Sequence, residues 1–199
     1  MSNGQALILA SESPRRAALL TAAGYRFIQQ TPPFDDSADP MEHLSPPHAA
    51  LALAQRKAAS LAQTIDAGVV LGADTLLSVD GRRLGKPHDA DDARRTLTLL
   101  FDRWHEVVTG VCLIDAATRR QAAFIDTAGV FIHPIPTDEL DRYIALGAWR
   151  GKAGGYNLAE LESRWRFEVR GEKSTVVGLP MKKLADALHQ FAQHLDPEA

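Results

Sequence analysis

Two residues in the stretch 69–87, VVLGADTLLSVDGRRLGKP, have side chains suited to phosphate chemistry. Asp74 is an acid within the apolar first half, and Lys86 lies between a glycine and a proline at the end. Between them, Asp80 and Gly81 readily adopt positive φ and predict a type I′ hairpin turn, which would bring Asp74 and Lys86 close together. A carboxylate that faces a lysine suits a phosphate or metal–phosphate site. An ordinary hairpin with a surface acid and a solvated lysine would produce the same pattern, so both interpretations stay open.

Residues 11–16, SESPRR, are a second candidate for phosphate binding. They follow a short apolar strand predicted over 6–10, and Ser13 can cap a helix that begins at Pro14. The backbone N–H groups and the dipole of a helix start favour an anion, and arginine adds paired donors that match phosphate oxygens. The alternative is a capped helix with solvated arginines. Phosphate binding is favoured because the strand end, the helix start and both arginines converge at one place.

Two carboxylates and a further lysine could complete such a site. Asp35 and Asp36 lie in an acidic, proline-rich loop, and could hold a metal or activate water if that loop folds over the site. On their own, such acids are more often solvated. Lys57 lies at the edge of the apolar stripe of a helix predicted over 47–65. Its side chain could point toward Asp74, but the pattern alone favours one that extends to solvent.

Further strands and helices must position these residues. Asp74 should end one buried strand, and a short second strand should follow it over 75–79. The remaining predicted elements are a strand over 25–30, a helix from Asp89 that buries Trp104, two long strands joined at 116–119, a helix over 137–147, a strand over 165–170 and a helix from Pro180. The glycine-rich turn at 151–156 lacks the spacing of a dinucleotide or P-loop motif.

The composition sets outer limits on fold and function. With 199 residues, 45% of them hydrophobic, the chain suits one domain, or one domain with two lobes, around a sizeable core. A formal charge of −3 argues against a nucleic-acid polymer as partner. No stretch is apolar enough to span a membrane and the N-terminus lacks signal-peptide features, so we expect a cytoplasmic protein. The lone Cys112 predicts a buried thiol, and His105 is more often structural than a ligand.

Seven motifs, in this order and spacing, resemble the Maf family along nearly the whole chain. They are SESPRRAALL at 11–20, the pair Lys57 and Ala58, GADT at 72–75, GKP at 85–87, HEVVTG at 105–110, GKAGGY at 151–156 and VVGLP at 176–180. The resemblance implies a single domain over 1–199 with an inosine-triphosphate-pyrophosphatase-like α/β fold, in which helices flank a mixed elongated sheet and two lobes surround a cleft. It further implies a homodimeric nucleoside triphosphate pyrophosphatase that uses Mg²⁺ or Mn²⁺ and releases monophosphate and pyrophosphate from non-canonical or modified nucleotides.

The resemblance also assigns roles to individual residues. Those implied in substrate binding are Ser11, Arg15, Arg16, Lys57 and Thr75. The implied catalytic residues are Asp74, Lys86 and Asp36. Asp74 would act as general base or metal ligand. Asp36 would be a second metal ligand, and it is preferred over Asp35 because the family usually has a glutamate at this position.

The departures from the family pattern lie mostly in the C-terminal half. Ala159 replaces a glutamine that many members have, Ala148 and Gly151 replace a glutamate and an aspartate, and residues 171–175 read GEKST where the family usually has GSYSN. The half that handles the triphosphate is intact, whereas the half expected to read the base is altered. We hypothesise that pyrophosphatase chemistry is retained with a shifted base preference. The alternatives are a nucleotide-binding regulator with little or no activity, and a structural or partner-binding protein.

Overall fold

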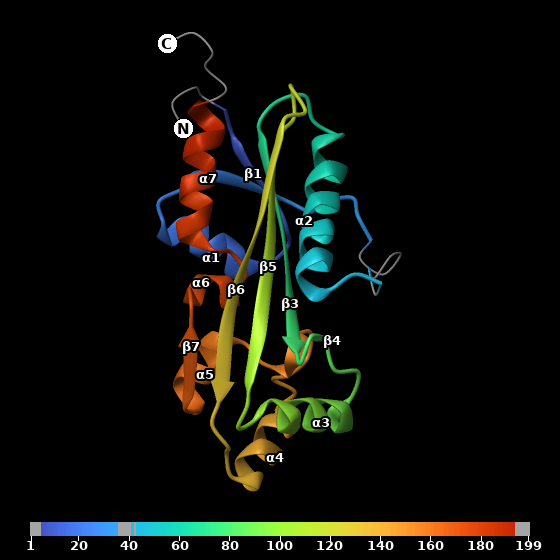
Figure 1. The fold of residues 1–199 in the computed structure, drawn as a ribbon, viewed down its shortest axis with the longest axis vertical. Helices are drawn as coiled ribbons and strands as arrows, with labels where there is room; N and C mark the ends of the chain where they lie inside the picture. The colour runs from blue at the N-terminus through green and yellow to red at the C-terminus, as the bar shows by residue number, and fades with distance from the viewer. Residues whose placement is uncertain (1–4, 36–40, 42, 194–199) are drawn as a thin grey trace.

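The structure is a computed structural model that describes residues 5–35, 41 and 43–193. It is elongated, and three long strands run along its length: β3 (Val69–Val79), β5 (Trp104–Asp115) and β6 (Gln121–Ile132) (Figure 1). Four shorter strands complete a seven-stranded sheet within the described residues: β1 (Leu7–Ala10), β2 (Phe27–Gln30), β4 (Arg82–Leu84) and β7 (Phe167–Arg170). The order across the sheet is β2-β1-β3-β5-β6-β7, and β4 pairs with β3.

The sheet is mixed, because β1 pairs in parallel with β2 and β3 whereas the other pairings are antiparallel. The β5–β6 pair confirms the two long strands predicted on either side of 116–119. Asp80 and Gly81, with φ values of 50° and 75°, connect β3 to β4 and confirm the predicted hairpin turn. Both turn residues lie in the left-handed region that this hairpin type requires.

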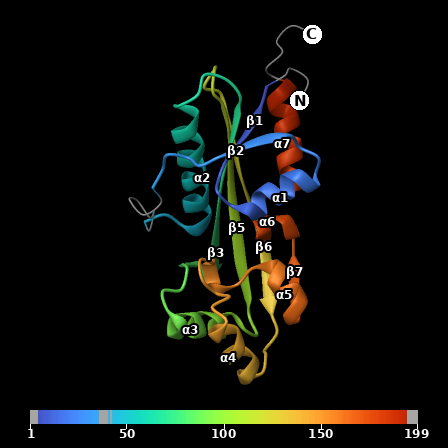
Figure 2. The same cartoon turned by 180° about the vertical axis from the view of Figure 1, so that it is seen from behind.

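Helices cover the two halves of the sheet differently and so produce two lobes. In one lobe, α2 (Pro46–Ala62) covers one face, while α1 (Pro14–Ala22) and α7 (Met181–Gln193) cover the other. In the other lobe, α3 (Ala90–Leu100), α4 (Thr137–Ala145) and α5 (Leu158–Arg164) pack on a single core. Figure 2 shows α1 beside the short helix α6 (Lys173–Val177), where the lobes meet. The elongated mixed sheet with flanking helices confirms the predicted fold class.

Local sequence explains where several helices begin and end. The Ser13 hydroxyl accepts a hydrogen bond from the backbone of Arg16 and caps α1, and Pro14 lies in its first turn. Asp89 caps α3 in the same way, at 2.8 Å from the backbone nitrogen of Asp92. None of the helices in the described part of the chain is long and apolar enough to cross a membrane.

Some of the predicted elements are wrong or incomplete. Asp74 does not end a strand, because β3 continues through it and pairs with β5 over residues 69–78. Trp104 belongs to β5 rather than to the preceding helix, since the chain leaves the helix at Phe101 and turns at Asp102, whose φ is 55°. The predicted strand over 165–170 begins two residues late, and the helices α5 and α6 were not predicted.

Glycine allows α2 to lie directly against the sheet. A Cβ atom at Gly110 would lie 2.5 Å from the backbone nitrogen of Leu51, and one at Gly72 would lie 2.8 Å from that of Ala58. We expect Gly110→Ala to lower the free energy of unfolding by about 3 kcal/mol, because a tightly packed helix cannot move aside freely. Urea denaturation measures this. Gly85→Ala is the control, since a Cβ there meets no atom within 4 Å, and equal stability of both variants would contradict the close packing.

Candidate active site

The candidate residues meet at a gap in one edge of the sheet. β1 pairs with β3 only as far as Gly72, and β4 pairs with β3 only from Leu77 onward. Within the described residues, positions 73–76 of β3 therefore have no strand partner on this edge. The chain leaves β1 at Ser11 and leaves β4 at Gly85, so both predicted phosphate-binding segments pass the gap. This register brings the two segments to the middle of β3.

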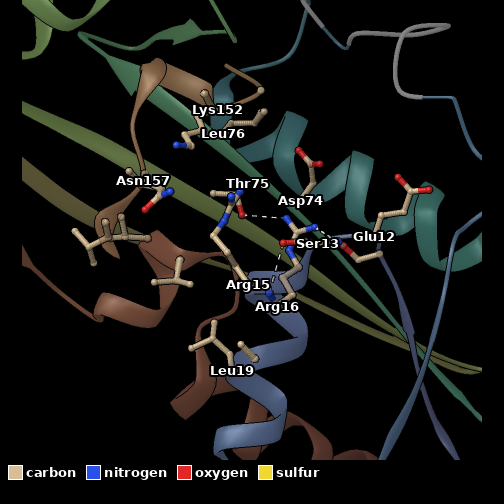
Figure 3. A pocket seen from close by; sticks show the side chains of 18 of the residues that line it. Glu12, Ser13, Arg15, Arg16, Leu19, Asp74, Thr75, Leu76, Lys152 and Asn157 are labelled. Atoms are coloured by element: carbon tan, nitrogen blue, oxygen red, sulfur yellow. Dashed lines mark hydrogen bonds between the residues drawn. The ribbon is translucent and has the colours of Figure 1, made fainter. Parts of the chain in front are cut away.

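A cavity of about 790 Å³ opens at this gap (Figure 3). Its lining includes seven of the candidate site residues, namely Ser11, Arg15, Arg16, Lys57, Asp74, Thr75 and Lys86, but not Asp35. Asp74 and Lys86 thus line the same cavity, and their direct proximity stays a prediction. Asp35 is exposed, whereas Asp36 lies outside the described residues, so the roles of Asp36 in catalysis and metal binding stay predictions.

The Asp74 carboxylate forms a buried ion pair with Lys57. The Lys57 ammonium lies 2.6 Å from Asp74 Oδ1, and the two side chains are 11% and 12% exposed. The interpretation that Lys57 extends to solvent is therefore wrong. Lys57 is on the sheet-facing side of α2, between the core residues Ala54 and Ala58, and this side points at the even-numbered residues of β3. The ion pair fixes the carboxylate at the cavity wall, because two desolvated charges attract strongly.

Hydrogen bonds to three described neighbours help to hold the Arg16 guanidinium. Its Nε group donates to the Gly178 carbonyl oxygen at 3.0 Å, and Nη1 donates to the Ser11 hydroxyl at 3.0 Å. Its Nη2 group donates to the Thr75 hydroxyl at 3.2 Å. Figure 3 shows Arg15 and Arg16 both extending from α1 toward Thr75. Two guanidinium groups at the start of a helix suit an anion chemically, and their binding of phosphate stays a prediction.

The glycine-rich turn forms the opposite wall of the cavity. Lys152 and Asn157 line it there, and in Figure 3 they lie across the cavity from α1. The backbone N–H of Gly154, which has a φ of 67°, donates to the Gly85 carbonyl oxygen at 3.0 Å. This bond ties the turn to the loop that carries Lys86. Apolar residues complete this wall: Leu76, Leu77, Val107, Leu158 and Val176. This end therefore suits the less polar part of a ligand.

The cavity carboxylates fit a divalent cation that binds together with a phosphate ligand. The described residues contain no group of three His, Cys, Asp or Glu that could hold a metal by itself. Mg²⁺ is commonly bound by one or two carboxylates plus substrate phosphates, and it keeps several waters. Asp74 and Glu12 both line the cavity and supply oxygen donors of this kind. The donor set thus suits a cation that arrives with its substrate.

The sequence model of the Maf-like protein family matches residues 6–191. The chain belongs to this family. It is 39% identical over 196 residues to the dTTP/UTP pyrophosphatase of Rhodopirellula baltica. The aligned region covers 98% of this chain and 86% of the relative. It is 38% identical over 185 residues to that of Desulforamulus reducens, with coverage of 93% and 96%. The enzyme of the same name from Vibrio vulnificus is 37% identical over 186 residues, with coverage of 93% and 98%.

The sequence did not single out several residues in or beneath the cavity of this Maf-like protein. Glu12 lies inside the SESPRR motif, so its position beside the two arginines was an available signal. Lys152 and Asn157 lie in or next to the glycine-rich turn, where only a backbone role was considered. The buried Thr109, which hydrogen-bonds to Thr75 at 2.9 Å, lies inside the HEVVTG motif, but its local pattern indicates no role because a threonine within a strand is common.

His105 of this Maf-like protein is buried and structural, as predicted. Its Nε2 atom lies 2.6 Å from the hydroxyl of Tyr156, which lines the cavity. Burial lowers the pKa of His105 from its ordinary 6.5 to about 4. Burial also raises the pKa of the Tyr156 hydroxyl, so the pair is neutral at physiological pH.

The low pKa of His105 predicts a loss of stability in mild acid. Between about pH 6.5 and pH 4 the unfolded chain binds a proton that the folded protein does not, so the free energy of unfolding falls as the pH falls. We expect a loss of about 2 kcal/mol between about pH 7 and pH 5, which His105→Gln should remove. Urea denaturation at both pH values measures it. His88→Gln, at an exposed site, is the control, and a pH dependence equal in both variants would contradict the assignment.

Proposed function

We propose that this Maf-like protein is a nucleoside triphosphate pyrophosphatase, which hydrolyses the bond between the α- and β-phosphates and releases a nucleoside monophosphate and pyrophosphate. The observation that carries the proposal is the Asp74–Lys57 ion pair in a cavity whose remaining charged lining is mainly cationic. The relatives named dTTP/UTP pyrophosphatases match almost the whole chain and support it.

The cations of the cavity bind the triphosphate in this proposal. Arg15 and Arg16 approach it from the start of α1, and Lys86 approaches from the loop after β4. Arginine matches phosphate oxygens with paired donors, and the helix start adds partial positive charge. Negative charge develops on the leaving pyrophosphate as the bond breaks. Fixed cations at that place stabilise the transition state more than the bound substrate.

Asp74 acts on the attacking water in this proposal. One carboxylate oxygen accepts from Lys57 at 2.6 Å, which fixes the side chain in the orientation that faces the cavity. A carboxylate held in this way can orient a water and accept its proton. Mg²⁺ or Mn²⁺ bound by Asp74 and Asp36 would neutralise charge on the phosphates. Lys57 has a positioning role through Asp74 and adds one more positive charge near the triphosphate.

The base preference is the finer part of the proposal. The names of the relatives make dTTP and UTP the substrates to test first. The altered residues between 148 and 175 motivate the alternative of a non-canonical or modified nucleotide. Asn157 is an amide on the wall opposite the arginines, where it offers both a donor and an acceptor to a base edge. Its position therefore suits a hydrogen bond to the base of dTTP or UTP as well as to that of a non-canonical or modified nucleotide.

A homodimer and a cytoplasmic location are also proposed, and both rest on the family resemblance. Sedimentation of the purified chain at several concentrations tests the dimer. A mass of one chain, about 21.7 kDa, at all concentrations would exclude it.

A panel of canonical and methylated nucleoside triphosphates, assayed for pyrophosphate release with Mg²⁺ and with Mn²⁺, tests the function. We expect turnover, with UTP and dTTP among the best substrates. A methylated nucleotide as the best substrate would instead support the shifted preference. Tight binding without turnover in either metal would support the alternative of a nucleotide-binding regulator and would contradict the proposed enzyme.

A further inference from the structure

A chain of hydrogen bonds runs beneath the cavity from Arg16 on α1 to helix α6. Arg16 Nη2 lies 3.2 Å from the Thr75 hydroxyl on β3. That hydroxyl lies 2.9 Å from the Thr109 hydroxyl on β5. The Thr109 hydroxyl lies 2.8 Å from the carbonyl oxygen of Thr175 in α6. Thr109 is fully buried and is not among the described residues that line the cavity, so it acts on the cavity only through its neighbours.

The two ends of this chain fix the direction of every hydrogen bond in it. The Arg16 guanidinium can only donate, and the Thr175 carbonyl can only accept. The Thr109 hydroxyl donates its single proton to that carbonyl, so it must accept from Thr75. The Thr75 hydroxyl then donates to Thr109 and accepts from Arg16. Each hydroxyl is locked in one orientation.

This direction changes the role predicted for Thr75. Its only proton is directed at Thr109, so the hydroxyl has none to donate to a phosphate oxygen while the chain of bonds is intact. Thr75 lines the cavity, but what it offers there is an acceptor that holds Arg16. The donor to the substrate is thus the guanidinium, and the threonines behind it determine where the guanidinium points.

The segment around α6 holds Arg16 at two places. The Gly178 carbonyl accepts from Arg16 Nε at 3.0 Å, and the Thr175 carbonyl ends the chain that begins at Nη2. The Thr175 hydroxyl in turn donates to Asp126, whose other oxygen pairs with Lys183 of α7. Helix α6 is therefore anchored on the side away from the cavity. A rigid acceptor at each position defines the plane of the guanidinium.

We propose that Thr109 is a positioning residue for substrate binding, which orients the Arg16 guanidinium toward the triphosphate through Thr75. The proposal rests on the proposed function, because it takes the cavity ligand to be a nucleoside triphosphate. Without the Thr109 hydroxyl, Thr75 loses the acceptor for its proton, and its hydroxyl is free to rotate away from Arg16. The guanidinium then keeps its hydrogen bonds to Gly178 and Ser11 but loses the one that fixes Nη2, and binding must restrict that group again at a cost in affinity.

Binding of α,β-imido-dUTP with Mg²⁺ tests this role without requiring turnover. We expect Thr109→Val, which has the same shape without the hydroxyl, to weaken binding about tenfold. Thr109→Ser restores the hydroxyl and should bind within about twofold of the parent. Ser174→Ala is the matched control, because it removes the hydrogen bond from the Met181 backbone to Ser174 at 3.0 Å in the same segment but leaves the chain of bonds intact. It should bind like the parent.

A double-mutant cycle separates positioning from general destabilisation. In an Arg16→Met background the guanidinium is gone, so adding Thr109→Val should weaken binding less than about twofold. An equal loss in both backgrounds, or parental binding by Thr109→Val, would overturn the proposal. Turnover of UTP by the parent is measured separately. Binding without turnover refutes the proposed enzyme but leaves this cycle valid, and a parent that does not bind the probe refutes both.

Discussion

Replacement of Asp74 by asparagine is expected to lower kcat for UTP hydrolysis about 10³-fold, within the range for loss of a catalytic base. Asparagine has nearly the same shape, but its neutral amide cannot accept a proton from water. It also cannot form the ion pair that the carboxylate makes with Lys57 at 2.6 Å. Nucleotide binding should be retained, because the change removes a negative charge beside the triphosphate. Steady-state assays of pyrophosphate release and equilibrium binding measure the two effects.

The variant Asp115→Asn is a control for the asparagine substitution itself. Asp115 is also a buried aspartate of the long strands, but it lies opposite Val69, several residues along the sheet from Asp74. This variant should keep the parental kcat. A parental kcat in Asp74→Asn would contradict the role assigned to Asp74, and equal losses in both variants would indicate a general effect on folding.

Replacement of Lys57 by methionine is expected to lower kcat/KM about 10²-fold and the free energy of unfolding by about 2 kcal/mol. Methionine keeps most of the apolar stem but leaves the Asp74 carboxylate, 12% exposed, without the ammonium that faces it. The carboxylate then loses its fixed orientation, and the triphosphate loses a nearby positive charge. Pyrophosphate release measures the activity, and urea denaturation measures the stability.

The matched control for Lys57 is Arg56→Met. Arg56 is the preceding residue of α2, and it is exposed where Lys57 is buried. This change removes a positive charge from the same helix without altering the cavity lining, so activity and stability should stay close to parental values. Similar losses in both variants would mean that activity and stability depend on the net charge of α2 rather than on the Lys57–Asp74 ion pair.

The residues of the candidate site could be predicted from the sequence, but the strand register that brings them together could not. The acid, the lysine and the two arginines were identified by residue type and by turn and cap signals. The structure brings them together at a gap in the edge of β3, because β1 ends opposite Gly72 and β4 begins opposite Leu77. Strand register depends on pairing between distant segments, and local sequence does not specify it. Asp74 was therefore placed at a strand end instead of beside the gap.

Two further errors have the same physical origin. A helical spacing of apolar residues continues from Leu97 and Leu100 to Trp104. Trp104 nevertheless lies in a strand, because the chain turns at Asp102, whose backbone N–H donates to the Ile132 carbonyl oxygen of β6. Lys57 lies at the edge of an apolar stripe, where a lysine normally reaches solvent. It is buried because a carboxylate lies opposite it on the neighbouring strand. The positions of Trp104 and Lys57 are both determined by contacts with segments that are distant in the sequence.

The sequence shows that the C-terminal half departs from the family pattern, but it does not show what the changed residues contact. The change at position 175 is the clearest example. Thr175 offers its carbonyl to Thr109 and its hydroxyl to Asp126, so it links the cavity floor to the surface pair of Asp126 and Lys183. Helix α6 has only five residues, which is too few for periodicity to predict it. Its importance for Arg16 is visible only in the folded chain.

The phosphate products of UTP hydrolysis test the central claim most directly. Phosphorus NMR of a reaction with Mg²⁺ distinguishes cleavage between the α- and β-phosphates from cleavage between the β- and γ-phosphates. We predict UMP and pyrophosphate in equal amounts as the initial products, and their absence with Asp74→Asn. UDP and orthophosphate as the initial products would contradict the proposed function, because the cavity would then cleave a different bond of the same substrate.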